Sequence, residues 1–110
     1  MLINEYWECD KGWYPLIKKA IAIVARYNGI NRYNPDFGPV EFSQIKEKWG
    51  GLCLYLNYYP SIKLEKEIRA IEDESLNICE HCGTKENVST KESHGWIFTL
   101  CDKCRQKEEI

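Results

Sequence analysis

Apolar residues recur every three or four positions in two stretches of the chain, the spacing of a helix with one buried face. The first stretch contains Leu16, Ile17, Ala20, Ile21 and Val24. It predicts a helix over residues 14–27, begun by Pro15 and closed by Asn28 and Gly29, which tolerate the left-handed conformation of a helix C-terminus. The second stretch contains Leu64, Ile68, Ile71 and Ser75. Preceded by Ser61, a good N-cap, it predicts a surface helix with one narrow buried edge.

Between these helices the pattern changes to the alternation that is typical of β-strands. A first strand starts at Val40, and its alternation breaks near Ser43 and Gln44, which predicts a bulge. The returning strand alternates Leu52, Leu54 and Leu56 with Cys53, Tyr55 and Asn57. Trp49 and the glycine pair at residues 50–51 lie between the strands, and paired glycines accept the positive φ angles of a tight hairpin turn.

A long loop, residues 30–39, joins the first helix to the first strand. It contains two prolines, two aromatic residues and one arginine, and it is longer than most connections inside compact domains. Long loops often carry function, although their aromatic side chains can also pack against the core. Together with the hairpin turn, the loop supplies the candidate partner-binding residues Arg32, Tyr33, Phe37 and Trp49. The competing interpretation places Trp13, Trp49 and Trp96, each beside a glycine, in the core or at its edge.

The last third of the chain carries the strongest chemical signal, two CxxC pairs separated by eighteen residues. The four cysteines are Cys79, Cys82, Cys101 and Cys104. Two thiols three positions apart on a tight turn can reach one ion, and Gly83 supplies the unusual backbone angle that such a turn needs. Four thiolates fill the coordination shell of Zn²⁺, so the spacing predicts one structural zinc ion rather than a catalytic metal with an open position.

The pattern around the two pairs predicts how the zinc module folds. Val88 and residues 96–100 form a short hairpin, and the second pair opens a short helix over residues 102–109. A knuckle, a hairpin and ligands at a helix start resemble a treble-clef zinc finger. The alternative is a zinc ribbon, against which the missing glycine after Cys104 argues. We therefore expect an α+β fold in which a helix–hairpin–helix unit, residues 1–78, and a treble-clef-like finger, residues 79–110, share one core and pack as a single domain.

Composition restricts the class of protein and its compartment. The chain has 110 residues, of which 44% are hydrophobic, enough for a modest core that a metal supplements. No apolar run is long enough to cross a membrane, and the N-terminus has two early acids and no basic region, so we expect a cytoplasmic protein. Four of its six cysteines lie in the CxxC pairs. Cys9 and Cys53 lie alone in apolar or aromatic surroundings, and we expect core residues there rather than a disulfide.

The charge balance argues against a general affinity for nucleic acids. Fifteen basic and seventeen acidic side chains give a formal charge of −2. Binding of Zn²⁺ by four thiolates changes this sum to about −4. Arg32 beside Tyr33, and Lys48 beside Trp49, would combine charge with base stacking. A nucleic-acid-binding finger is therefore the alternative function, but the net charge does not favour it.

The residues of the finger do not favour an enzyme. Treble clefs also occur in HNH nucleases, which are identified by paired histidines around a second, catalytic metal. This sequence offers His94 at the expected hairpin tip, no histidine on the last helix, and a poorly placed Asn87. His81 lies inside the first CxxC pair and should point away from the metal. Neither pair follows the βαβ pattern of thioredoxin-type redox motifs, and we expect no catalytic residues.

Four segments together resemble a group of small proteins of bacteriophages and prophages. They are residues 12–17 (GWYPLI), 44–52 (QIKEKWGGL), 79–83 (CEHCG) and 95–101 (GWIFTLC). The resemblance implies a phage-type accessory protein and brings no catalytic residues with it. Phage proteins of this size often inhibit a host or anti-phage defence factor, so we expect a host protein or complex as the partner, in the cytoplasm of a bacterial host. Self-association is also compatible with the pattern, because a two-stranded sheet needs a covering surface.

Overall fold

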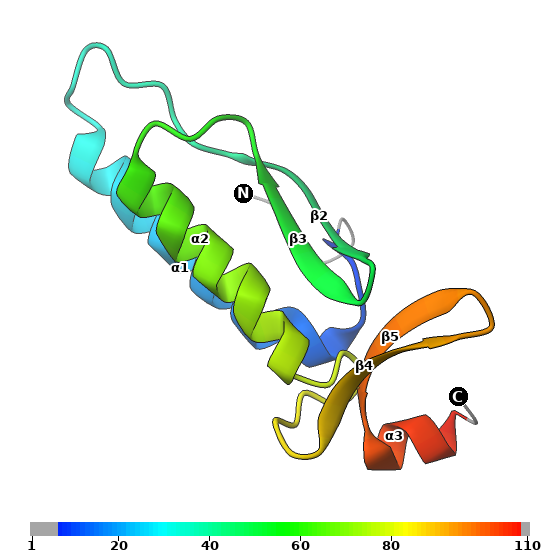
Figure 1. Ribbon diagram of the computed structural model, residues 1–110. Helices are drawn as coiled ribbons and strands as arrows, with labels where there is room; N and C mark the ends of the chain where they lie inside the picture. Colours follow the sequence, from blue (N-terminus) through cyan, green and yellow to red (C-terminus); the bar gives the residue numbers. More distant parts are fainter. Residues whose placement is uncertain (1–6, 109–110) are drawn as a thin grey trace.

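The computed structural model describes residues 7–108, which contain three α-helices and two small sheets (Figure 1). The helices are α1 (Tyr14–Asn31), α2 (Ile62–Glu74) and α3 (Asp102–Lys107), with short 3-10 helices η2 (Lys11–Trp13) and η3 (Ser75–Asn77). The strands are β1 (Trp7–Glu8), β2 (Phe42–Lys48), β3 (Gly51–Leu56), β4 (Val88–Ser93) and β5 (Trp96–Cys101). The molecule is elongated, with principal extents of 54 × 23 × 20 Å. The predicted mixed α+β class is confirmed.

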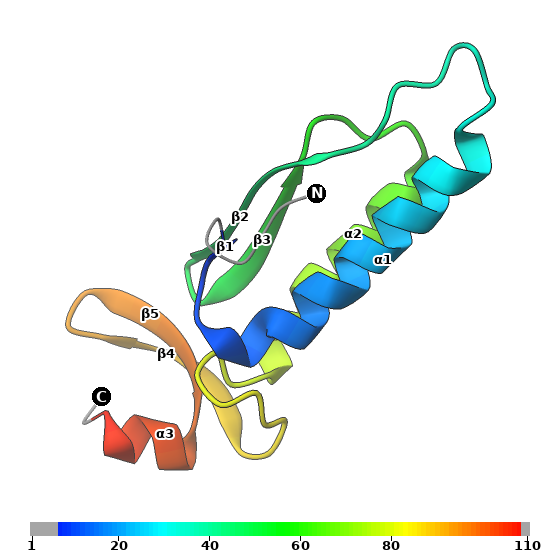
Figure 2. The ribbon, with the colours of Figure 1, turned by 180° about the vertical axis from the view of Figure 1, so that it is seen from behind.

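A three-stranded sheet and two helices make up the larger unit. β2 lies in the middle, antiparallel to β3 and parallel to β1. α1 and α2 lie side by side on one face of the sheet, as both views show (Figures 1 and 2). The predicted stripe of α2 faces the sheet and continues into η3, and its members Leu64, Ile68, Ile71 and Ser75 are buried. Full burial of one aliphatic side chain contributes about 1.5–3 kcal/mol, so the stripe holds α2 on the sheet.

The first helix is longer than its sequence pattern predicted, because Asn28 makes a long-range contact instead of ending the helix. The Asn28 side chain accepts a hydrogen bond from the Val40 N–H and donates one to the Val40 carbonyl, each at 2.9 Å. This pair of bonds ties α1 to the segment just before β2. Gly29 stays inside the helix, where glycine costs about 1 kcal/mol relative to alanine. The helix ends at Asn31, and the long loop begins at Arg32.

The β2–β3 hairpin contains both irregularities that the sequence predicted. The pairing register shifts within residues 42–44, which confirms the bulge. Lys48 pairs with Gly51, so the turn consists of Trp49 and Gly50 alone. Both turn residues have positive φ, 56° for Trp49 and 79° for Gly50, as two-residue hairpin turns of this kind require. Gly51, which was expected in the turn, is instead the first residue of β3.

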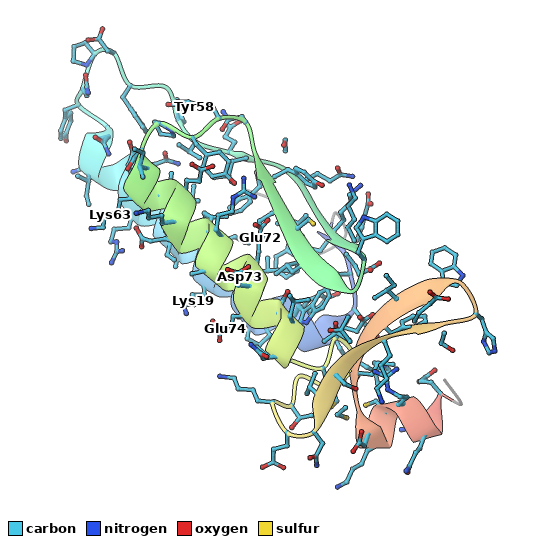
Figure 3. The ribbon with its side chains drawn as sticks, viewed as in Figure 1. Lys19, Tyr58, Lys63, Glu72, Asp73 and Glu74 are labelled. Atoms are coloured by element: carbon cyan, nitrogen blue, oxygen red, sulfur yellow. The ribbon has the colours of Figure 1, made fainter. Side chains whose placement is uncertain are left out.

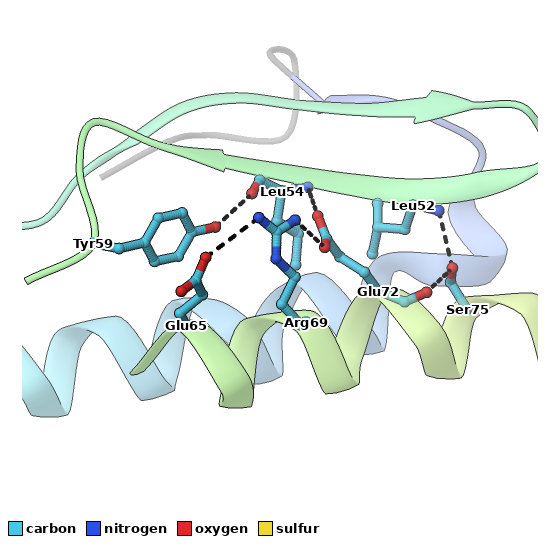
Figure 4. A network of polar contacts seen from close by, with 7 residues as sticks. All are labelled: Leu52, Leu54, Tyr59, Glu65, Arg69, Glu72 and Ser75. Atoms are coloured by element: carbon cyan, nitrogen blue, oxygen red, sulfur yellow. Dashed lines mark hydrogen bonds and ion pairs between the residues drawn. The ribbon is translucent and has the colours of Figure 1, made fainter. Parts of the chain in front are cut away.

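The outer edge of β3 is covered by side chains that follow it in the chain (Figure 4). The Leu52 N–H donates to Ser75 Oγ at 2.9 Å. The Leu54 N–H donates to Glu72 Oε2 at 2.8 Å, and the Tyr59 hydroxyl donates to the Leu54 carbonyl at 3.4 Å. Edge strands with free backbone groups pair with other chains, so these contacts protect β3 from such pairing.

Ion pairs connect the two long helices on the side that faces away from the sheet. Lys19 of α1 lies 3.5 Å from Glu74 of α2, and Figure 3 shows both side chains on this outer surface. Arg26 lies 3.6 Å from Glu67 in the same way. Exposed pairs contribute at most about 1 kcal/mol each, so apolar packing remains the main contact between the helices. Within residues 7–108, no helix is long and apolar enough to cross a membrane.

The C-terminal third forms a smaller unit from β4, β5 and α3. β4 and β5 make a separate antiparallel sheet, and His94 and Gly95 form the turn between them. Both turn residues have positive φ, 53° and 86°. The hairpin was predicted, but β4 extends further toward the turn than expected. α3 ends at Lys107. The end of the predicted helix, Glu109, lies outside the described residues.

The buried apolar residues form two clusters rather than the one shared core that the sequence predicted. The larger cluster lies between the first sheet and helices α1 and α2. The smaller cluster consists of Cys79, Leu100, Cys101 and Cys104, with Val88 and Phe98 packed against it. The sequence suggested one core because no linker separates α2 from the first cysteine pair. Two stretches of chain that follow each other without a linker can therefore still bury their apolar side chains in separate clusters.

Hydrogen bonds between backbone and side chains join the two units. The Gly12 N–H donates to the Glu80 carbonyl at 2.9 Å, and Trp13 Nε1 donates to the Ile78 carbonyl at 3.0 Å. Gly12 lies so close to the turn at residues 79–83, which we call the knuckle, that a Cβ on Gly12 would be 2.2 Å from the carbonyl oxygen of Cys79. This close approach leaves no room for any side chain at residue 12.

A second contact between the units connects the two hairpins. The Thr99 hydroxyl of β5 donates to the Gly50 carbonyl in the β2–β3 turn. Thr99 is fully buried, and the Thr90 hydroxyl lies 2.7 Å from its own. Around the same residue, the Thr99 N–H donates to Glu80 Oε2 at 2.9 Å. Burial and its neighbours Glu47 and Asp10 raise the Glu80 pKa to about 7, despite the stabilising Thr99 bond.

Candidate metal centre

The structure brings the four predicted cysteines together. Cys79, Cys82, Cys101 and Cys104 place their sulfur atoms within 4.8 Å of one another. Three of the four side chains are buried, and only Cys82 is exposed. Zn–S bonds of about 2.3 Å in a tetrahedral shell put the sulfurs about 3.8 Å apart. The Cys82 and Cys101 sulfurs lie 3.8 Å apart, and the four together could hold one metal ion.

A tight turn positions the first cysteine pair. The Gly83 N–H donates to the Cys79 carbonyl at 2.9 Å, and Gly83 has the predicted positive φ, 83°. The Cys82 N–H points at the Cys79 sulfur, 3.5 Å away. The Cys79 N–H donates to the Thr84 carbonyl at 2.9 Å, which closes the turn. Both sulfurs are therefore held on one side of a short backbone loop.

The end of β5 and the start of α3 position the second pair. Cys101 is the last residue of β5 and the N-cap of α3. Its sulfur accepts the Cys104 N–H at 3.4 Å, the same pattern as in the first pair. Backbone N–H groups that donate to sulfur stabilise the thiolate form, which is the form that binds metal.

The surroundings shift the thiol pKa values of two ligands in opposite directions. Burial raises the pKa of Cys79, but backbone N–H groups outweigh burial and lower it to about 6. Burial and the neighbouring thiols raise the pKa of Cys104 well above its usual range. The backbone thus favours the thiolate form of Cys79, whereas ionisation of the whole group needs a cation to offset the mutual repulsion. The cluster is thus chemically suited to a metal ion.

Neither histidine belongs to the cluster. His81 Nδ1 lies 2.9 Å from Asp10 Oδ2, and His81 Nε2 lies 3.8 Å from Glu108 Oε1. His81 therefore connects the end of α3 to the chain before η2. His94 lies exposed in the β4–β5 turn. Among residues 7–108, the four cysteines are the only group of three or more potential ligands close enough to share an ion.

The two remaining cysteines are half-buried and free. Burial raises the Cys9 pKa to about 11, and the nearby acids Asp10, Glu80 and Glu47 add to the shift. Cys53 lies on β3. The prediction that these cysteines do not form a disulfide agrees with the structure.

The predicted partner-binding residues do not form one surface. Arg32 and Tyr33 lie together at the end of α1, with the guanidinium 4.8 Å from the ring centre, and Tyr33 is 84% exposed. Phe37 packs against Tyr27, with 6.0 Å between ring centres, and so belongs partly to the core side of the loop. Trp49 lies at the opposite end of the sheet, in the turn that contacts the finger (Figure 1).

The tryptophans beside glycines divide into one core residue and two surface residues. Trp13 is fully buried, as the core interpretation expected. Trp49 is 72% exposed and Trp96 is 70% exposed, so that interpretation is wrong for both. Trp96 was missed as a surface residue, although its place beside a His-Gly turn was a usable signal. Side chains at the tip of a hairpin have few neighbours to cover them.

Comparisons of the chain with protein-family models, with curated proteins and with solved structures gave no match. The function therefore has to be argued from the metal centre and the exposed side chains.

Proposed function

We propose that the four cysteines bind one Zn²⁺ ion, which stabilises a treble-clef finger. Thiolate donors in a tetrahedral set favour zinc over the harder divalent cations. A knuckle supplies two ligands, and after a hairpin the start of a helix supplies the other two, which is the order of elements in a treble clef. Four protein donors leave no position for a substrate, so the role of the ion in this proposal is structural.

The activity that we propose is binding of another protein, and Trp49 is the observation that carries it. Non-glycine residues adopt positive φ rarely, and for a bulky side chain the left-handed conformation costs about 1–2 kcal/mol. Trp49 has a φ of 56° and leaves 72% of its surface exposed. Asparagine or glycine would form the same turn without this cost. The fold gains little from tryptophan at this position, which supports a role in recognition.

Trp96, at the start of β5, is a second strongly exposed tryptophan. Ile97 and Thr99 of β5 face Gly50, the neighbour of Trp49, so the Trp96 side chain, which alternates with theirs, lies on the other face of that hairpin. We call Trp49 and Trp96 the tryptophan pair. Tryptophan is enriched among the few interface residues that dominate binding free energies, because it buries a large apolar area with few rotatable bonds.

The more specific proposal is an inhibitor of a host or anti-phage defence factor, acting in the bacterial cytoplasm without catalytic residues. It rests on the resemblance of the four segments to phage accessory proteins. A rigid fold that presents one exposed tryptophan on each of its two hairpins would suit such a role, because preorganised side chains lose little entropy on binding.

A capture experiment with the tagged full chain and nuclease-treated bacterial lysate tests the proposal. Wild type is compared with the double variant Trp49→Ala/Trp96→Ala and with Tyr33→Ala, which removes an even more exposed ring at the other end of the molecule. We expect one dominant protein with wild type and with Tyr33→Ala. The double variant should recover at least about tenfold less, because hot-spot side chains contribute about 2 kcal/mol or more each.

Two other results would change the assignment. Equal recovery by the double variant would move the binding site away from the tryptophan pair. Recovery of nucleic acid alone from untreated lysate, with binding that falls steeply as salt rises, would favour the nucleic-acid alternative. That alternative is supported by two pairings of a basic residue with an aromatic ring: Arg32 at 4.8 Å from the ring centre of Tyr33, and Lys46 Nζ at 5.8 Å from that of Tyr55. Metal content and thermal unfolding confirm that each variant is folded.

A further inference from the structure

Arg105 follows the ligand Cys104 on α3, and its guanidinium lies among neutral acceptors of the finger. Its Nη2 donates to the Ser89 carbonyl at 2.7 Å, and the Ser89 hydroxyl and the Leu100 carbonyl each lie 3.4 Å away. Its Nε is buried and has no hydrogen-bond partner within residues 7–108. The other two basic residues of α3, Lys103 and Lys107, are exposed.

A guanidinium in this position lacks an anion. Within the described part of the chain, Arg105 forms no ion pair with a carboxylate, unlike Lys19, Arg26 and Arg69. Arg105 is half-buried, and a positive charge that is partly withdrawn from water without an anion is destabilising. A nearby negative charge would offset this cost, and no described carboxylate supplies it.

The metal centre would supply that charge. Four thiolates and one divalent cation carry a net charge of about −2. Arg105 is adjacent to the ligand Cys104, and it donates to the carbonyl of Leu100, which directly precedes the ligand Cys101. Contacts to β4 and β5 thus hold the guanidinium at the backbone that leads into the second cysteine pair.

We propose that Arg105 is the counter-cation of the metal centre, a positioning residue that stabilises the four-thiolate state. This inference rests on the proposed four-cysteine zinc site. A positive charge next to the ligands withdraws electron density from the thiolates and makes them weaker nucleophiles. Residues outside the coordination shell that orient or neutralise metal ligands commonly change metal affinity by about 10- to 100-fold. Cys82, the exposed ligand, is where a reagent would detect the difference.

The experiment uses the zinc-loaded full chain and three variants. Arg105→Met removes the charge and the hydrogen bonds, Arg105→Lys keeps the charge, and Lys103→Met removes an exposed charge that is equally close in sequence to Cys104. Two rates are measured: zinc transfer to excess chromogenic chelator and alkylation of the loaded protein by iodoacetamide. For Arg105→Met we expect both rates to rise about tenfold or more. Arg105→Lys should lie closer to wild type, and Lys103→Met should stay within about twofold of it.

Cobalt substitution separates a charge effect from a general loosening of the finger. Wild type loaded with Co²⁺ should show tetrahedral thiolate absorption, and Arg105→Met should keep its intensity while the sulfur-to-metal charge-transfer band shifts. If Arg105→Lys released zinc as fast as Arg105→Met, and the charge-transfer band shifted in neither variant, the counter-cation role would be overturned. Arg105 would then act only through its hydrogen bonds to Ser89 and Leu100.

Glu109→Gln is a further control, since Glu109 lies outside the described residues. If Glu109→Gln released zinc as fast as Arg105→Met, the charge partner of Arg105 would be the Glu109 carboxylate rather than the metal centre. If wild type gives no tetrahedral cobalt spectrum, the proposed metal site itself is wrong.

Discussion

Trp49 adopts a backbone conformation that lowers the stability of the fold. Its backbone lies in the left-handed region, and its indole is mostly in water. Within residues 7–108, the other non-glycine residues with positive φ are Asn87 and His94, both of types that tolerate this conformation better. Its neighbour Gly50 also has positive φ and contacts the finger, so the turn itself is required. The turn is therefore explained by packing, whereas the tryptophan in it is not.

Replacing this tryptophan should stabilise the protein. We expect Trp49→Asn to raise the free energy of unfolding by about 0.5–1 kcal/mol, because asparagine suits the first position of this turn. Urea unfolding followed by circular dichroism measures the change, with Tyr33→Asn as a control for loss of an exposed ring. A loss of 1 kcal/mol or more, about the worth of a good packing contact, would show that the indole supports the fold and would weaken the binding proposal.

The cysteines of the proposed metal site provide the second test at the scale of single residues. Cys79→Ser and Cys101→Ser should each lose bound metal and leave the C-terminal third sensitive to protease, because metal binding supplies much of the folding free energy of small finger modules. Metal analysis and limited proteolysis report both effects. Cys53→Ser, which changes a half-buried thiol outside the cluster, serves as the matched control. Full stability of a Cys79→Ser/Cys101→Ser double variant under chelation would rule out a structural metal.

At the scale of elements, α2 and its extension η3 do two things for β3. Their apolar stripe covers the face of the sheet, and Glu72 and Ser75 cover its edge. Ser61 fixes where α2 begins, since its hydroxyl accepts the Leu64 N–H at 3.3 Å. The capping residue, the stripe and the edge contacts thus set one register for the helix against the strand.

Removing the edge contact should cost more than removing a surface ion pair. Glu72 and Glu65 both pair with Arg69, at 3.3 and 3.5 Å, but only Glu72 also accepts the Leu54 N–H. Glu72→Ala should lower the free energy of unfolding by about 1–3 kcal/mol, because it leaves a buried N–H unpaired. Glu65→Ala should change it by less than about 1 kcal/mol. Urea unfolding compares the two, and similar losses would mean that the edge bond contributes little.

At the scale of the whole molecule, the two units are joined mainly through glycines and buried polar groups. Gly12 lies against the knuckle, and Gly50 lies against the second hairpin. Thr99 reaches across to Gly50 from β5. A junction built from close backbone contacts fixes one relative position, since any added side chain would push the units apart.

Two glycine variants should therefore change stability in opposite directions. A Cβ on Gly12 would lie 2.2 Å from a backbone carbonyl, whereas one on Gly29 would meet nothing within 4 Å. Gly12→Ala should destabilise the protein by about 2 kcal/mol or more, because the backbone has to move. Gly29→Ala, inside α1, should stabilise it by about 0.5–1 kcal/mol. Thermal unfolding measures both, and a neutral Gly12→Ala would show that the two units can separate freely.

Local patterns in the sequence determined the helices, the bulge, the Ser61 cap, the hairpins and the four-cysteine cluster. Each of these depends on residues a few positions apart, where periodicity and backbone preference act directly. The cysteine ligands were predictable for the same reason, because each pair sits on one turn.

Only the tertiary structure decided the features that depend on distant residues. Asn28 ends a helix by local preference but is held inside α1 by Val40. The tryptophan beside Gly12 is buried, whereas Trp49 and Trp96, also beside glycines, are exposed, because burial depends on which elements cover a position. The sequence suggested one core, whereas the buried apolar side chains form two clusters. Short-range preferences thus specify the elements, and long-range contacts specify which of their side chains remain free to act.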